Sequence, residues 1–218
     1  MSIITTPHLQ RLWSDAQDHP EWATTRLWKY VFHHLVFSDE KWVVSSQQPP
    51  THKPGDPRRL DIVVESWDSS ATTTEALRTL LFVVATPASA SPSEIEQVEY
   101  QAFTAACAHI VETKIESVWA MTCVGSAARL WLVAKAGIYL IPFVAPGESL
   151  TDRGGYLEIT THGQDVINAL EYIKEHPVPP KELLGKRPLP RPEHARLPPS
   201  WHDSEVAEID QILLHAGA

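Results

Sequence analysis

The segment from Arg59 to Gln101 constrains the fold of this 218-residue chain more than any other part of it. It opens with a β-rich run, Leu60 to Trp67, and after a Ser/Thr-rich gap it continues with the almost wholly apolar run Leu77 to Ala85. A short apolar run of this kind is typical of a central strand that is buried on both faces of a sheet. A capping box, Ser91 to Glu94, then predicts the start of a long helix. The segment therefore predicts two strands followed by a helix.

Helical patterns precede this segment. Thr6 and Pro7 predict a capped helix start, and a second helix is predicted from about Pro20 because apolar residues there recur at helical spacing. The apolar stripe of this second helix consists of Leu27, Trp28, Val31, Phe32 and Leu35. Residues 41–46 are predicted to form a short strand, and residues 47–57, which are rich in Pro, His and Gly, are predicted to form a loop.

Strand patterns follow the predicted long helix. Ser117 to Val124 and Ala127 to Ala134 flank a two-residue turn, which predicts a hairpin. Ile138 to Val144 is predicted to form a fifth strand, and Pro142 indicates an edge position because proline cannot donate a hydrogen bond to a neighbouring strand. An amphipathic helix is predicted over residues 164–176.

This order of elements indicates an α/β (α+β) domain with a mixed central sheet flanked by helices. We expect a single domain over residues 1–176, with a helical N-terminal extension at 1–46 and a core at 59–145. Residues 177–218 are expected to form a Pro-rich strap and a short terminal helix, since eight prolines lie between residues 177 and 199. So short a helix is not stable alone in water and would dock on its own domain or on another copy, which allows a homodimer.

Bulk composition narrows the functional classes. The formal net charge of −9 argues against a general nucleic-acid binder, which is usually basic. Two cysteines are too few for a disulfide framework, and no apolar stretch is long enough to span a membrane. The N-terminus lacks the basic start and apolar run of a secretory signal. We therefore expect a cytoplasmic protein with no membrane partner.

Three motifs together resemble a known superfamily. They are Arg59-Leu60-Asp61, the run Phe82 to Thr86, and Glu99-x-Gln101-Ala102-Phe103. Their order and the elements that carry them resemble the PD-(D/E)XK nuclease-like superfamily, and most closely its fungal uncharacterised branch. The turn within residues 121–131 resembles a segment of the same group. The resemblance covers residues 59 to 145 and implies a nuclease-like fold.

The resemblance also implies a metal site, and the sequence departs from it. In the superfamily, an Asp and an acid on the next strand bind the metal, and a Lys two residues later assists the attacking water. Asp61 matches the first acid, but Val84 stands in the place of the second and Thr86 in the place of the lysine. A hard divalent cation needs oxygen ligands, which valine does not offer. We therefore expect no intact metal nuclease centre and no cofactor, with Mg²⁺ only if a nuclease activity persists.

Migration of a carboxylate is the alternative that would preserve a centre. Strand alternation puts Asp61 and Glu65 on one face, and Glu99 resembles a helix acid that some superfamily members use near the metal. Asp61, Glu65, Glu99 and Gln101 are therefore the candidate catalytic residues, and Asp61 and Glu99 would be metal ligands only if a site persists. In the structural alternative, Asp61 begins a strand, Glu65 ends it in solvent, and Glu99 is a charge at the helix margin.

Three functions stay open from the sequence. The first is a nuclease-like fold reused for binding or for a different chemistry, with RNA or tRNA among its partners. The second rests on a looser resemblance to fungal arginine-containing cyclodipeptide synthases, which use aminoacyl-tRNA; such an enzyme needs an acidic pocket for the arginine guanidinium. The third is an interaction protein that dimerises through the Pro-rich strap and the terminal helix. The sequence does not decide whether the chain is an enzyme.

Overall fold

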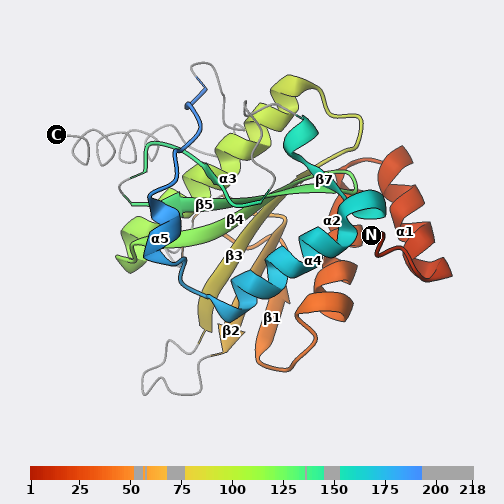
Figure 1. The fold of residues 1–218 in the computed structure, drawn as a ribbon, viewed down its shortest axis with the longest axis horizontal. Helices are drawn as coiled ribbons and strands as arrows, with labels where there is room; N and C mark the ends of the chain where they lie inside the picture. Colours follow the sequence, from red (N-terminus) through yellow and green to blue (C-terminus); the bar gives the residue numbers. More distant parts are fainter. Residues whose placement is uncertain (52–55, 57, 68–76, 136, 145–152, 193–218) are drawn as a thin grey trace.

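A mixed sheet forms the centre of the structure, a computed structural model that describes residues 1–51, 56, 58–67, 77–135, 137–144 and 153–192 (Figure 1). Within these residues the sheet has seven strands in the order β1-β2-β3-β4-β5-β6, and β7 pairs with β5. The strands are β1 (Trp42–Ser45), β2 (Ile62–Trp67), β3 (Leu77–Thr86), β4 (Ser117–Val124), β5 (Ala127–Ala134), β6 (Ile141–Pro142) and β7 (Leu157–Glu158). The helical elements are α1 (Pro7–Asp18), α2 (Glu21–Val31), the π-helical turn η1 (Phe32–Val36), α3 (Pro92–Thr113), the 3₁₀ turn η2 (Arg153–Gly155), α4 (Ile159–Glu175) and α5 (Lys181–Leu184).

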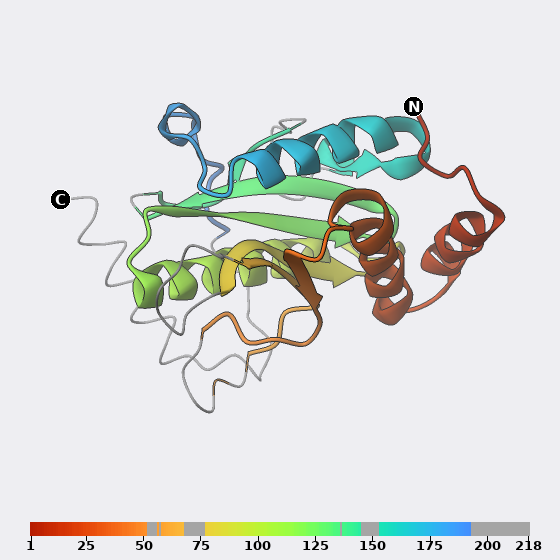
Figure 2. The same cartoon turned by 90° about the horizontal axis from the view of Figure 1, so that it is seen from below.

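Helices cover both faces of the sheet. Figure 2 shows α4 on one side of β4 and β5 and α3 on the other. The two faces have separate apolar cores: Ile62 and Val64 of β2 pack with α1, α2 and α4, whereas Val63 packs with α3. Alternate residues of one strand thus face opposite cores, as the two-residue period of a strand requires. This is the three-layer arrangement of a mixed α/β domain, and it confirms the expected fold class.

The helix α3 between β3 and β4 explains why the sheet is mixed rather than wholly antiparallel. Strands β1, β2 and β3 are successively antiparallel, and β4 is parallel to β3. A parallel pair needs a crossover connection, which α3 provides. Strands β4 and β5 then form the predicted antiparallel hairpin. The predicted edge position of Pro142 is also confirmed, because β6 ends the strand order.

Local sequence signals for helix starts are confirmed. The hydroxyl of Thr6 accepts a hydrogen bond from the N–H of Leu9 at the start of α1. The capping box of α3 has both of its hydrogen bonds, between Ser91 and Glu94. Gly125 in the β4–β5 turn has φ of +59°, and a Cβ at this position would lie 2.5 Å from the Cβ of Ala88. The turn therefore requires glycine for both its backbone angle and its close packing.

Several predicted boundaries are wrong. The second helix converts to the π-helical turn η1, so Leu35 is 41% exposed rather than part of the buried stripe. Only Ile141–Pro142 pair as a strand within the predicted fifth strand, and α4 begins at Ile159 rather than at residue 164. The Pro-rich strap contains the short helix α5. The predicted terminal helix and the Ser/Thr-rich gap at 68–74 lie outside the described residues.

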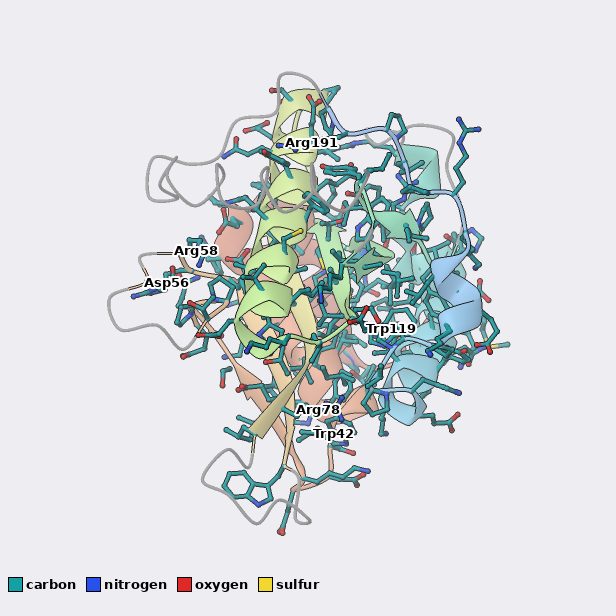
Figure 3. All side chains as sticks on the ribbon, turned by 90° about the vertical axis from the view of Figure 1, so that its left-hand side faces the viewer. Trp42, Asp56, Arg58, Arg78, Trp119 and Arg191 are labelled. Carbon is teal, nitrogen blue, oxygen red and sulfur yellow. The ribbon has the colours of Figure 1, made fainter. Side chains whose placement is uncertain are left out.

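The described part of the strap lies against the core. The N–H of Leu189 donates to the carbonyl of Leu140, and the guanidinium of Arg191 donates to the hydroxyl of Tyr100 on α3. Figure 3 shows Arg191 beside one end of α3. Within the described part of the chain, no helix is both long enough and apolar enough to cross a membrane.

Candidate functional site

A polar pocket of about 660 Å³ lies where the first turns of α2 and α3 meet the chain ends around β2 and β3. Its described lining combines carboxyl, amide and hydroxyl groups with a few apolar side chains. The lining residues are Pro20, Glu21, Gln47, Arg59, Asp61, Val84, Ala85, Thr86, Pro87, Glu94, Gln97, Val98 and Gln101. Asp61 and Gln101, both candidates from the sequence, therefore lie in one pocket.

Asp61 is held at the base of this pocket by the main chain of β3. Its side chain is 7% exposed, and its Oδ2 accepts a hydrogen bond of 2.8 Å from the N–H of Ala85. Its Oδ1 lies 3.4 Å from the amide nitrogen of Gln47, which donates to it. The carboxyl is thus fixed by one strong bond and one weak bond, and it faces the pocket rather than bulk solvent.

A second carboxyl, that of Glu21, lies within hydrogen-bonding reach of Asp61. Burial raises the pKa of Asp61 to about 7, the N–H of Ala85 opposes this shift, and the charge of Glu21 adds to it. Because repulsion from Glu21 adds to the effect of burial, the Asp61 carboxyl holds a proton below about pH 7. Asp61 can therefore exchange this proton for a bound cation.

The position of Glu21 depends on how α2 docks on the sheet. The hydroxyl of Thr24 donates to the carbonyl of Thr86 at 3.2 Å, and the indole N–H of Trp28 donates to the carbonyl of Gly125 at 2.9 Å. Glu21, Thr24 and Trp28 are spaced by three and four residues and therefore share one face of α2. The same face that anchors the helix thus brings Glu21 to the pocket.

A buried ion pair between Asp56 and Arg58 holds the chain that precedes Asp61. Arg58 donates to both carboxylate oxygens of Asp56, at 2.9 and 2.7 Å, and both side chains are buried. Figure 3 shows these two side chains close together, at the left edge of the molecule. The guanidinium of Arg59 donates to the carbonyls of Asp56 and Arg58. The positive charge of Arg59 in the pocket lining is therefore already engaged by main-chain oxygens.

Gln47 reaches the pocket through an unusual backbone conformation. Its φ is +56°, in the left-handed region that residues other than glycine rarely adopt. Such a conformation costs on the order of 1 kcal/mol and is often found at functional sites. Here it aims the Gln47 amide at Asp61, next to the amides of Gln97 and Gln101 in the lining.

Val84 and Thr86 line the pocket beside Asp61, where a hydrolytic metal centre would need an acid and a lysine. Among the residues that the structure describes, no group of three or more His, Cys, Asp or Glu side chains is arranged to hold a metal ion. Mg²⁺ requires near-octahedral oxygen ligation, and Val84 supplies hydrocarbon to this space. The residues present therefore do not fit the metal centre that the superfamily would imply.

Glu65 and Glu99 do not join Asp61 in the pocket. Glu65 is half-buried on β2 opposite Thr79, beyond a register shift that follows Val64. Glu99 faces the sheet on the other side of α3, is fully buried, and accepts a hydrogen bond of 2.8 Å from the hydroxyl of Tyr156. The expectation that Glu99 is a charge at the helix margin is wrong, because α3 is buried along most of its surface. Whether either residue is catalytic stays a prediction.

Glu21 and Gln47, the two pocket residues that interact with Asp61, are among those that the sequence reasoning missed. The spacing of Glu21, Thr24 and Trp28 could have indicated Glu21, because it puts all three residues on one face of the helix. Thr24 and Trp28 of that face bind the sheet. No sequence signal indicates the left-handed backbone of Gln47, because this conformation depends on the tertiary contacts of its loop.

Comparisons with known proteins assign no family. No protein-family model matches the chain, and no curated protein sequence matches it. Among solved structures, the chain is similar to the type IIG restriction endonuclease BpuSI, with a TM-score of 0.38 and 12% sequence identity. The similarity covers 76% of this chain and 16% of the chain of that enzyme. A likeness at this level assigns neither a family nor an activity to the chain.

Proposed function

We propose that this chain is a degenerate PD-(D/E)XK nuclease-like domain whose polar pocket binds a cationic group of its ligand instead of a hydrolytic metal. One observation carries the proposal: Val84 and Thr86 line the pocket beside Asp61, so hydrocarbon and hydroxyl stand where an acid and an ammonium would be needed. Without these groups, attack on a phosphodiester lacks an activated water and charge stabilisation.

The topology supports the nuclease-like part of the proposal. Three antiparallel strands, a crossover helix and a fourth strand parallel to the third bring the start of β2 and the end of β3 to one pocket. The resemblance of the sequence motifs implied this arrangement. Asp61 keeps the position of the first acid in it.

The electrostatics of the pocket support a cationic ligand group. Its described lining has three carboxyls, those of Glu21, Asp61 and Glu94, against the single guanidinium of Arg59. That guanidinium already binds two main-chain carbonyls. Carboxylates prefer planar guanidinium or ammonium partners, and Asp61 would release its proton when such a group binds.

Calorimetry with methylguanidinium at pH 6.5 tests the binding. We expect binding accompanied by proton release, seen as an enthalpy that depends on the ionisation enthalpy of the buffer. Asp61→Asn should abolish the proton release, whereas Glu65→Gln, which removes a carboxyl of β2 outside the pocket, should preserve it. Binding without buffer dependence, or no binding to the unmodified protein, would contradict the proposal.

Nuclease assays test the loss of hydrolysis. DNA and RNA incubated with the protein and Mg²⁺ or Mn²⁺ should stay intact. Metal-dependent cleavage that disappears in Asp61→Ala would overturn the proposal and would favour a nuclease with a displaced carboxylate, for which Glu21 is the nearest candidate.

A tRNA-dependent arginine-containing cyclodipeptide synthase is the second candidate function. The acidic pocket favours it, because an arginyl substrate needs carboxylate partners for its guanidinium. Expression with aminoacyl-tRNA present and mass analysis for a cyclic arginine-containing dipeptide tests it. Absence of a product would count against this candidate and would leave the binding proposal unaffected.

A further inference from the structure

The polar pocket carries more acidic groups than one positive charge can match. Its described lining has three carboxyls, those of Glu21, Asp61 and Glu94, and one guanidinium, that of Arg59. Even with the charge of this guanidinium counted in full, the described lining has two acidic groups in excess. A ligand with a single positive charge therefore leaves one of them unmatched.

Glu94 places one carboxyl at the rim of the pocket, in the first turn of α3. Its Oε2 accepts hydrogen bonds of 2.7 Å from both the N–H and the hydroxyl of Ser91, which form part of the capping box of this helix. The N–H of Ser91, followed by its hydroxyl, holds the pKa of Glu94 below its usual value. The carboxyl is therefore ionised at neutral pH, and it is exposed and fixed through one of its two oxygens.

Asp61 places a second carboxyl at the base of the same pocket. It is buried where Glu94 is exposed, and the main-chain N–H of Ala85 on β3 holds its Oδ2. Glu21 lies within hydrogen-bonding reach of Asp61 and adds its charge at this position. The pocket thus has two fixed acidic positions at different depths, and a main-chain N–H holds the carboxyl at each of them.

Hydrocarbon lines the pocket beside both acidic positions. Val98 follows Glu94 by four residues and therefore lies next to it on one face of α3. Val84 precedes Ala85, which binds Asp61, and the two valines belong to one apolar cluster. A bare metal ion gains nothing from such a surface, whereas a chain of methylene groups is removed from water there. The lining therefore suits an organic cation with an aliphatic stem.

We propose that the pocket binds an aliphatic dication, in which a short chain of methylene groups carries an ammonium group at each end. One ammonium group binds Asp61 and Glu21 at the base, and the other binds Glu94 at the rim. The methylene chain lies along Val84 and Val98. This ligand class rests on the proposed function, because it takes the first cationic group as given and adds a second one. Free diamines have this chemistry, and so does a lysine at the N-terminus of a peptide.

Calorimetry of the full chain at pH 8 and low salt compares butylamine, which has one ammonium group, with putrescine, which has the same stem and two. We expect both amines to bind and putrescine to bind more tightly. An ion pair with an exposed carboxylate is weak, so the loss of the Glu94 charge should lower the affinity for putrescine by up to about fivefold. Glu94→Gln tests this, because glutamine at this position retains the capping box with Ser91. The affinity for butylamine should stay unchanged in this variant.

Glu96→Gln is the matched control, because it removes a carboxyl of the same helix outside the pocket lining, and it should change neither affinity. Equal losses for both amines in Glu94→Gln, or no loss, would overturn the dication and leave the proposed function standing. If neither amine binds the unmodified protein, both are overturned. Cadaverine and lysinamide, whose two ammonium groups are joined by the same number of carbon atoms, distinguish the source. Tighter binding of cadaverine indicates a free diamine, and tighter binding of lysinamide indicates the N-terminal lysine of a peptide.

Discussion

Replacement of Asp61 by asparagine should stabilise the protein at alkaline pH. The folded chain raises the pKa of this carboxyl from 3.8 to about 7, chiefly by burial. Between these two values, the folded state keeps a proton that the unfolded state releases, so the free energy of unfolding falls as the pH rises. Each pH unit in this window costs about 1.4 kcal/mol. Above pH 7 the free energy of unfolding has lost the whole contribution of this carboxyl, and below pH 3.8 it has lost none of it.

The magnitude can be tested as a difference between two pH values. From pH 5 to the folded pKa of about 7, the wild-type protein should lose about 3 kcal/mol more than Asp61→Asn, at about 1.4 kcal/mol per pH unit. Asparagine has nearly the same shape, accepts the hydrogen bond from Ala85 and can donate to Glu21. Its advantage should therefore be about 3 kcal/mol larger at pH 8 than at pH 5.

Urea denaturation at pH 5 and pH 8 measures both proteins. Titrating groups that do not interact with Asp61 are shared by the two proteins, so they cancel in the comparison. A difference between wild type and Asp61→Asn that is the same at both pH values would refute the reasoning, because it would mean that Asp61 is ionised normally in the folded state. In a Glu21→Gln background the pH-dependent gain should shrink, since the repulsion from Glu21 is then absent.

Three further outcomes are expected. Gly125→Ala should lower the free energy of unfolding by about 2–4 kcal/mol, because its positive φ disfavours a side chain and the new Cβ would meet Ala88; urea denaturation measures this loss. Thr24→Val should weaken the docking of α2 and so move Glu21 away from Asp61. The loss in free energy of unfolding between pH 5 and pH 8 should then be smaller, whereas the neighbouring Thr25→Val should leave this loss unchanged. If the chain is a homodimer, light scattering should give twice its 24.4 kDa mass, and deletion of residues 178–218 should give a monomer; a full chain that is already monomeric contradicts this.

The features predicted well from the sequence depend on neighbouring residues. The Thr6 cap, the Ser91 capping box and the β4–β5 hairpin each satisfy or redirect backbone groups within a few residues. Such signals survive in any tertiary context, and the mixed sheet followed from their order. Leu35 shows the limit, because the π-helical turn rotates it away from the face that regular helical spacing predicts.

The candidate site was predicted only in part because its members come from distant segments. Asp61 and Gln101 were identified, but the partner of Asp61 is Glu21, which precedes it by a helix and a strand. The helical pattern misled in the case of Glu99, since α3 packs on the sheet with one side and lines the pocket with another. Because the sheet covers one side of this helix and the pocket another, its charged residues cannot be assigned to solvent from spacing alone.

The contacts that anchor α2 determine which substitutions the sheet can accept without loss of this helix. Thr24 and Trp28 bind carbonyl oxygens of the chain at Thr86 and Gly125, and such oxygens are present whatever side chain the position carries. Substitution of the Thr86 side chain therefore leaves the hydrogen bond from Thr24 of α2 in place. Val84, by contrast, belongs to the buried apolar cluster that packs on α3, so a glutamate at that position should destabilise the protein even though α2 stays anchored.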